Sequence, residues 1–361
     1  MIQTGAQFAK ALVAWQTRHG RHDLPWQQHR TPYRVWVSEI MLQQTQVATV
    51  IGYFRRFMAR FPDPAALAAA SMDEVLHQWT GLGYYARGRN LHRAAIRIRD
   101  EFNGEFPTHF DEVESLPGIG RSTAGAILAL SQGQRCTILD GNVRRVLSRW
   151  FGIAAQPADR AATTLLWQRA DECTPQEDVA LYTQAIMDLG ATVCVRRKPR
   201  CDDCPVANGC VARQTGRQHE LPVAKSRHAA RPARQTHMVV ALRPDGSVFL
   251  RQRPPVGIWG GLWAAPAFDT AAEAQSFAAQ LLGAPGVKSR AAEPLQLPAF
   301  AHAFTHFDLT ITPWLVRCNG LAAVMDAPDS LWYDARRPAT VGLPAPVKRL
   351  LERVAESYKE S

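Results

Sequence analysis

The sequence has no long hydrophobic run. No stretch of its 361 residues approaches the roughly 18 consecutive apolar residues of a membrane span, and the N-terminus lacks the charged and apolar regions of a secretory signal. From these absences we expect neither a membrane segment nor export. We therefore expect a cytoplasmic protein that does not act at a membrane.

Acidic residues are outnumbered. The chain has 32 Asp and Glu against 42 Lys and Arg, a formal net charge of +10. A basic surface favours a polyanionic partner, because lysine and arginine neutralise phosphates and release condensed counterions. A basic protein with no such partner is the alternative that composition leaves open. The length and the 46% hydrophobic content suffice for two packed cores, so we expect two domains.

Cysteine is also scarce, and its odd number of seven leaves at least one unpaired. A secreted disulfide framework is therefore disfavoured, and a reducing cytosol is the natural setting. Four cysteines form the array C-x6-C-x2-C-x5-C at Cys194, Cys201, Cys204 and Cys210. This spacing predicts ligands around one inorganic centre, either zinc or an iron–sulfur cluster, and disfavours mere core thiols. Spacing alone does not separate zinc from iron.

The periodicity of apolar residues changes along the chain. Residues 1–213 read as nearly all helix, with start signals such as the capping box Ser71–Glu74 and a threonine before Pro32 and before Pro175. Residues 214–236 are rich in arginine with one acid, which predicts a basic linker that touches a phosphate backbone or is simply solvated. Residues 237–361 alternate with period two and contain two helical stretches, as expected for a small α+β domain.

A glycine-rich motif runs from Leu116 to Gly125 between two helical stretches. Gly118 and Gly120 allow a tight turn that brings backbone amides against a ligand, and the helix beginning near Arg121 presents its positive end to an anion. The motif predicts a helix-hairpin-helix that binds phosphate. A plain turn between two packed helices is the alternative.

Two carboxyl groups are the candidate acids. Glu39 lies in a predicted helix among apolar neighbours three and four positions away, where a carboxyl is reluctant to ionise; a surface glutamate is the alternative. Asp140 precedes a helix whose N-terminus would keep it ionised, and an ordinary N-cap is the alternative. A neutral acid paired with an anion is what glycosidic cleavage through an oxocarbenium-like state requires.

These motifs, in this order and at these intervals, resemble the MutY adenine DNA glycosylase family of the helix-hairpin-helix superfamily. The resemblance covers nearly the whole chain and includes Ser38–Gln46, Gly81–Tyr85, the hairpin, Leu139–Asn142 and the cysteine array. It implies an all-α helix-hairpin-helix glycosylase with a [4Fe–4S] cluster domain, followed by an α+β Nudix-like domain. Residues from about 30 to 130 would form a six-helix barrel, and residues 1–29 and 131–213 the cluster-containing domain.

The resemblance also implies roles for single residues. Glu39 would protonate the adenine leaving group and help position water, and Asp140, with Asn142 in the same motif, would stabilise the sugar cation or bond to it transiently. The implied DNA contacts are Gln44 and Tyr84 inserted into the duplex, Thr45 and Leu82 beside the oxidised guanine, and Trp26, Val47 and Gln184 around the extruded adenine. Simple packing is the alternative for Trp26, Val47 and Leu82.

Ser122 distinguishes branches of this superfamily. The related glycosylase/lyases have a lysine there, whose amine attacks the sugar to form a Schiff base. Serine cannot do this, so strand nicking should be absent or weak. In the neighbouring purine-pocket segment, His22 and Gln27 stand where some relatives have arginine.

The C-terminal segment Gln252–Trp263, with Phe304, Thr305 and His306 further on, resembles the Nudix-like domain with which this family recognises 8-oxoguanine. A catalytic Nudix hydrolase needs clustered acids to hold magnesium, and residues 264–290 contain no such cluster. The domain is therefore expected to recognise and not to hydrolyse. Phe304, Thr305 and His306 are its candidate contact loop, and a strand-edge turn is the alternative.

Together these features predict a monofunctional DNA glycosylase of base excision repair. It would hydrolyse the N-glycosidic bond of adenine opposite 8-oxoguanine or guanine in double-stranded DNA, acting as a monomer at the bacterial nucleoid. A glycosylase/lyase of the endonuclease III type and a non-catalytic iron–sulfur protein that binds mismatches are the alternatives. A nucleotide pyrophosphatase is disfavoured by the missing acids.

Overall fold

The computed structural model describes residues 4–154, 156, 159–223, 231–282, 294–318 and 327–359. The chain divides into two compact units. The first is Met1–Ala69 with Asn90–Arg227, and the second is Ala70–Arg89 with His228–Ser361. Among the described residues, no helix combines the length and the apolar character needed to cross a bilayer.

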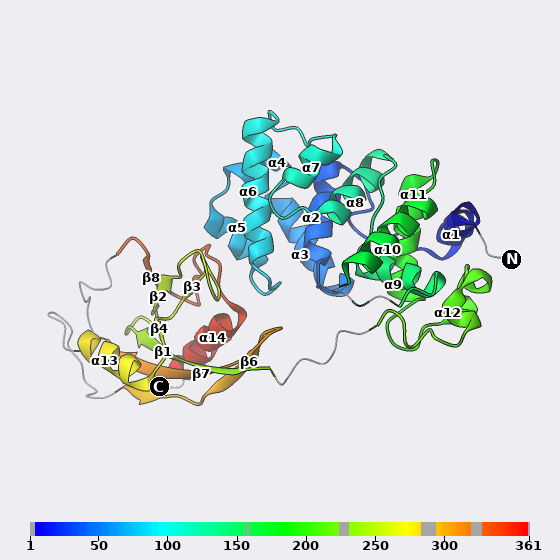
Figure 1. Cartoon of the computed structure of the whole chain (residues 1–361). Coiled ribbons are helices and arrows are strands. Elements are labelled where there is room, and N and C mark those ends of the chain that lie inside the picture. Colours follow the sequence, from blue (N-terminus) through cyan, green and yellow to red (C-terminus); the bar gives the residue numbers. More distant parts are fainter. Residues whose placement is uncertain are drawn as a thin grey trace. The chain divides into compact units, whose positions relative to one another are not determined.

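The first unit is helical, as predicted (Figure 1). Its helices are α1 (Gly5–His19), α2 (Pro32–Leu42), α3 (Val47–Arg60), α4 (Pro64–Ala69), most of α6 (Ala86–Glu101), α7 (Phe110–Ser115), α8 (Arg121–Gln132), α9 (Gly141–Trp150), α10 (Arg160–Cys173), α11 (Val179–Thr192) and α12 (Val211–Gln214), with 3-10 turns at Cys201–Asp203 and Ala207–Gly209. A core of α1, α9, α10 and α11 forms around Phe8 and Trp150, whose rings lie 4.4 Å apart. This core holds α9 against α11.

The helix-start signals have mixed outcomes. The Thr31 side chain accepts a hydrogen bond from the Arg34 amide and Pro32 opens α2, as predicted. The expectation for Pro175 is wrong. The Thr174 hydroxyl instead donates back to the carbonyl of Ala170 at the end of α10, and α11 begins only at Val179.

The second unit is an α+β domain with a mixed sheet, as predicted. Its strands are β1 (Ala233–Leu242), β2 (Val248–Gln252), β3 (Trp263–Ala264), β4 (Ala267–Phe268), β5 (Leu295–Gln296), β6 (Phe300–Ala303), β7 (Asp308–Arg317) and β8 (Ser330–Tyr333), and its helices are α5 (Met72–Trp79), α13 (Ala271–Leu282) and α14 (Ala345–Lys359). The main path runs β3-β2-β1-β7-β5, with β1 and β7 parallel.

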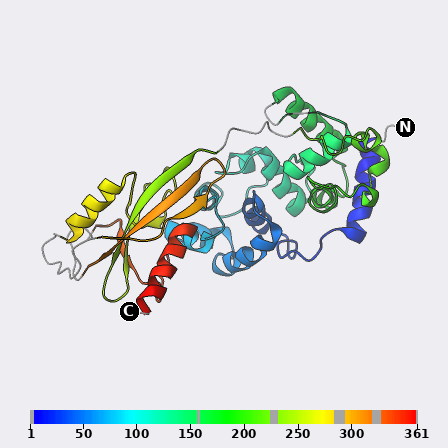
Figure 2. The ribbon, with the colours of Figure 1, turned by 90° about the horizontal axis from the view of Figure 1, so that it is seen from below.

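The two C-terminal helices cover opposite faces of this sheet (Figure 2). Trp314 and Val316 of β7 belong to a core with α13, whereas Leu315 lines a groove with Leu350 of α14. Alternating strand residues therefore face different helices. Strand β1 begins at Ala233, inside the predicted linker, because its first residue pairs with Asp308 of β7. Residues 224–230 of that linker lie outside the described residues.

Candidate active site

The first unit contains a pocket of about 610 Å³. It is formed by the loop before α2, by α2 and the turn after it, and by α3, α8, α9 and α11. The predicted site residues that line it are Trp26, Glu39, Gln44, Thr45, Val47, Ser122, Asp140, Asn142 and Gln184. The structure thus brings together residues that are far apart in the sequence.

Glu39 lies on the pocket side of α2 beside Val35 and Leu42, which also line the pocket. Burial, the larger cause, and the negative charge of Asp140 together raise the pKa of the Glu39 carboxyl to about 7. The predicted reluctance to ionise is therefore confirmed. Both carboxyl groups line the same pocket.

Asp140 is the N-cap of α9 and accepts a hydrogen bond of 2.8 Å from the Val143 amide. The N-terminus of α9 was expected to keep Asp140 ionised, with a pKa shifted in the direction opposite to that of Glu39. This expectation is wrong. Burial raises the pKa of Asp140, and hydrogen bonds from Val143 and Asn142 and the charge of Arg145 oppose that rise only in part. Asp140 is thus both an N-cap and a pocket-lining residue, so the capping interpretation does not exclude a role in the site.

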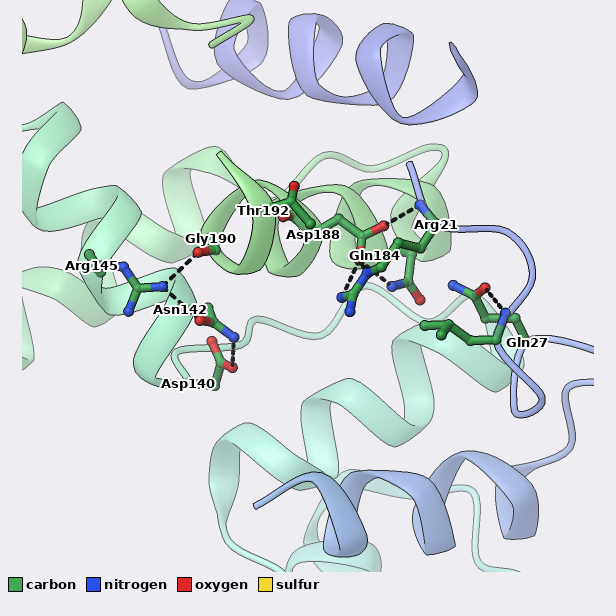
Figure 3. A network of polar contacts seen from close by, with 10 residues as sticks. Arg21, Gln27, Asp140, Asn142, Arg145, Gln184, Asp188, Gly190 and Thr192 are labelled. Carbon is green, nitrogen blue, oxygen red and sulfur yellow. Dashed lines mark hydrogen bonds and ion pairs between the residues drawn. The ribbon is translucent and has the colours of Figure 1, made fainter. Parts of the chain in front are cut away.

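A chain of polar contacts holds Asp140 from behind (Figure 3). The Asn142 amide donates to Asp140 over 3.4 Å, and one Arg145 nitrogen donates to both Asn142 Oδ1 and the Gly190 carbonyl at 2.7 Å. A Cβ on Gly190 would lie 2.6 Å from that of Asn142, so glycine is needed for α11 to approach α9 this closely. Sequence reasoning missed Arg145. Its place one helical turn after Asn142 was the available signal.

A second set of contacts involves Gln184 and Asp188, which lie on α11 shortly before Gly190 (Figure 3). Asp188 is fully buried and accepts hydrogen bonds from the Arg21 backbone amide at 2.9 Å and from Arg21 Nε at 2.8 Å. It also accepts one of 3.0 Å from the Gln184 amide. This buried ion pair fixes the orientation of Gln184 in the pocket wall. Arg21 and Asp188 were also missed, because their pairing joins distant parts of the chain.

Ser122 and the hairpin are placed by α8. The Ser122 hydroxyl accepts a hydrogen bond of 2.9 Å from the Leu139 amide, and its residue lines the pocket. Gly118 has a φ of 82°, and a Cβ there would lie 2.7 Å from that of Asn90, so only glycine fits this turn. Gly120 is the N-cap of α8, which begins at Arg121 as predicted. Neither glycine is among the pocket-lining residues.

The four cysteines of the array line one small cavity of about 30 Å³ together with Arg149. Arg149 donates to the Cys194 sulfur at 3.3 Å, and the Cys210 thiol donates to the Arg149 carbonyl at 3.5 Å. Burial raises the pKa of Cys204 to about 12, and the other three thiols add to the rise. Within the described ranges, no group of three or more His, Cys, Asp or Glu is arranged as a site for a single metal ion.

Comparison with known proteins identifies the family. The family described as HhH-GPD superfamily base excision DNA repair protein matches residues 37–172, and the NUDIX domain family matches residues 237–353. An adenine DNA glycosylase from Buchnera aphidicola (subsp. Acyrthosiphon pisum) is 36% identical over 346 residues, which cover 96% of this chain and 97% of that protein. The chain belongs to the adenine DNA glycosylase family. The human member is 34% identical over 379 residues, covering 89% of this chain and 69% of its own.

Solved structures agree with the fold of the helical part. A thermostable thymine-DNA glycosylase superposes with a TM-score of 0.53 at 24% identity, over 58% of this chain and 95% of that one. Endonuclease III in a non-covalent DNA complex gives a TM-score of 0.50 at 22% identity, over 59% and 98%. These likenesses show a shared architecture between the adenine DNA glycosylase family and other helical glycosylases.

Leu82 and Tyr84 lie in the second unit, on the loop between α5 and α6. Tyr84 is 42% exposed and has a φ of 48°. The guanidinium of Arg87 lies 5.4 Å from the centre of the Tyr84 ring. Leu82 is buried, with 6% of its surface exposed. Of the two predicted residues, only Tyr84 presents its side chain to solvent here.

Phe304, Thr305 and His306 form the turn between β6 and β7. Phe304 stacks on Phe307 at 4.4 Å and packs against Trp259 at 5.8 Å, whereas Thr305 and His306 are exposed. The turn is therefore at a strand edge, as the alternative held, and aromatic packing fixes its shape. Its two exposed side chains are available to a ligand.

Proposed function

We propose that this chain is a monofunctional adenine DNA glycosylase of base excision repair. Its substrate would be adenine opposite 8-oxoguanine or guanine in double-stranded DNA. One observation carries the proposal: Glu39 and Asp140 line the same pocket, and the charge of one raises the pKa of the other. Membership of the adenine DNA glycosylase family supports adenine as the base that is released.

The pocket supports acid-assisted hydrolysis of a glycosidic bond. An adenine extruded from the duplex enters the pocket, and Glu39, neutral below about pH 7, donates its proton to a ring nitrogen as the bond from that base to the sugar breaks. The bonding electrons leave with the base, and the sugar becomes an oxocarbenium-like cation. Asp140 stabilises that cation as an anion or bonds to it transiently. Water then adds to the sugar, and its proton returns to Glu39.

The pocket walls support recognition of the base. Trp26 and Val47 provide apolar surface, and Gln184 provides an amide held by Asp188. Gln44 has a φ of 59° and Tyr84 one of 48°. Left-handed backbone at non-glycine residues is sparsely populated and concentrates at functional sites. It therefore supports the role of these two residues as wedges in the duplex.

Further contacts with DNA follow from the family pattern. The amides around Gly118 and Gly120, at the start of α8, would hold a backbone phosphate. Thr45 and Leu82 would lie near the oxidised guanine, and the turn with exposed Thr305 and His306 next to Phe304 would recognise it. The net charge of +10 supports binding to DNA at the bacterial nucleoid, where the chain would act as a monomer.

The cysteine cavity supports a [4Fe–4S] cluster. Four thiols line it, the donor number and type of such clusters, and Arg149 donates to one sulfur. Backbone amides of Val206 and Arg213 bond to Cys204 and Cys210. Bound there, a cluster would join the segments from Cys194 to Cys210 through its four ligands.

Single-turnover release of adenine from a defined duplex tests the proposal. Glu39→Gln should abolish release while duplex binding persists, because the amide has no acidic proton to transfer to the leaving base. Asp140→Asn should also be severely impaired. If the wild type releases adenine but borohydride traps no protein on the DNA, the protein is not a glycosylase/lyase. A wild-type chain that binds the mispair and never releases adenine would instead be a mismatch-binding protein.

A further inference from the structure

The segment Ala70–Arg89 is grouped with the C-terminal residues in the second unit, although it precedes most of the helical region in sequence. It consists of α5, the loop Gly81–Tyr85 and the start of α6. That loop carries Tyr84, the residue proposed to enter the duplex. The contacts that hold the loop are therefore contacts within the second unit.

The Tyr85 hydroxyl connects the loop to the chain before α14. It accepts a hydrogen bond of 3.3 Å from the Gly81 amide and donates one of 2.9 Å to the Leu343 carbonyl. The Leu343 amide in turn donates to the Thr80 hydroxyl at 3.3 Å. Both backbone groups of Leu343 are thus bound by side chains that flank the loop. Tyr85 and Leu343 are 8% and 3% exposed, so the bond between them is buried, whereas the Gly81–Tyr85 and Leu343–Thr80 bonds are partly buried.

Close packing along α5 keeps this contact in place. A Cβ on Gly342 would lie 2.5 Å from that of Leu76, so the backbone of the C-terminal segment lies directly on the helix. The Trp263 indole donates to Asp73 at 2.9 Å at the first turn of α5. The helix is therefore fixed near both of its ends.

The loop itself has a backbone that needs external support. Gly81, Gly83 and Tyr84 have φ values of 95°, 77° and 48°. Left-handed conformations at a residue such as tyrosine persist only where surrounding contacts enforce them. The Tyr85 and Thr80 hydrogen bonds flank these three residues on both sides.

We propose that Tyr85 and Thr80 are positioning residues through which the Nudix-like domain sets the orientation of the loop that bears Tyr84. Neither residue touches the reacting atoms. The Tyr85 hydroxyl links Leu343 to Gly81, and the Thr80 hydroxyl links Leu343 to the end of α5, directly before the loop. The inference rests on the proposed function, because it concerns how Tyr84 is presented to a mispair.

The experiment compares two tyrosine hydroxyl deletions. Tyr85→Phe removes only the oxygen that joins Gly81 to Leu343. Tyr33→Phe is the matched control, because the buried Tyr33 hydroxyl also donates to a backbone carbonyl, that of Phe61, at 2.8 Å in the first unit. Each variant is assayed for thermal midpoint, for single-turnover adenine release, and for fluorescence of a 2-aminopurine placed beside the mispair, which reports unstacking.

Tyr85→Phe removes the bonds of the hydroxyl to Gly81 and to Leu343, and it should weaken the unstacking signal and slow release about tenfold. Tyr33→Phe should lower the thermal midpoint at least as much and leave both readouts at the wild-type level. Thr80→Val should behave as Tyr85→Phe does, and Thr80→Ser, which keeps the hydroxyl, should restore the wild-type values.

Unchanged unstacking and release in both Tyr85→Phe and Thr80→Val would overturn the proposal. An equal loss in Tyr33→Phe would also overturn it, since reduced stability would then explain the effect. If the wild type unstacks the duplex but releases no adenine, the proposed function fails. The unstacking signals of the four variants still decide whether these residues position the loop.

Discussion

Glu39 should make the stability of the protein depend on pH. Burial and the charge of Asp140 raise its pKa from the ordinary 4.5 to about 7. Between these pH values the unfolded chain releases a proton that the folded chain retains. The free energy of unfolding therefore falls as the pH rises from about 4.5 to about 7 and remains lowered above that range.

The size of the effect follows from the interval between 4.5 and about 7. At about 1.4 kcal/mol for each pH unit, the penalty reaches about 3 kcal/mol in the fully ionised state. Glu39→Gln retains the shape of the neutral acid and has no proton to release. The variant should match the wild type near pH 4.5 and exceed its free energy of unfolding by about 3 kcal/mol at pH 8.

Urea denaturation at pH 4.5 and pH 8, at constant ionic strength, measures this difference. Glu105→Gln, at an exposed position after α6, controls for loss of a carboxylate and should change the free energy of unfolding by less than about 0.5 kcal/mol at both pH values. Adenine release by the wild type should fall about tenfold between pH 6 and pH 8, because the same proton is used. A stability difference that is equal at both pH values would falsify the raised pKa.

Three further substitutions test other parts of the site. Arg145→Met removes the donors to Asn142 and Gly190 and should slow single-turnover release by a factor corresponding to about 1.5–3 kcal/mol. The control variant Arg144→Met should release adenine at the wild-type rate. Equal rates in the two variants would contradict the positioning of Asp140. Ser122→Lys places an amine in the pocket wall and should create a borohydride-trappable complex with DNA; a folded variant that is never trapped would show that this position does not reach the sugar. Cys204→Ser should abolish iron-dependent visible absorption and lower the thermal midpoint, and Cys136→Ser, outside the array, should keep the absorption; equal absorption in both would exclude Cys204 as a ligand.

Local patterns predicted the parts of the site that depend on local physics. The capping sequence of α2, the turn at Gly118 and the start of α8 each follow from a few adjacent residues. The apolar neighbours of Glu39 predicted its raised pKa for the same reason. The convergence of the four cysteines was predicted because their spacing is short.

Long-range contacts could not be read in the same way. The Arg21–Asp188 ion pair joins residues 167 positions apart, and no periodicity connects them. The direction of the pKa of Asp140 was mispredicted because a sequence shows the helix end but not the depth of burial. Thr174, before Pro175, donates back to α10 and does not cap a following helix. The local sequence does not determine which of the two helices a threonine between them will bond to.

Helix α11 carries Gln184, which lines the pocket and is held by Asp188, and also Gly190, whose carbonyl accepts a hydrogen bond from the Arg145 side chain that donates to Asn142 beside Asp140. The contacts that would govern base selectivity and those that position Asp140 therefore depend on the same helix. A mutation that tilts it to admit a different base would also displace the anion, so new substrates are not easily gained by small steps. This shared support predicts that variants selected to accept another purine will first appear as slow enzymes.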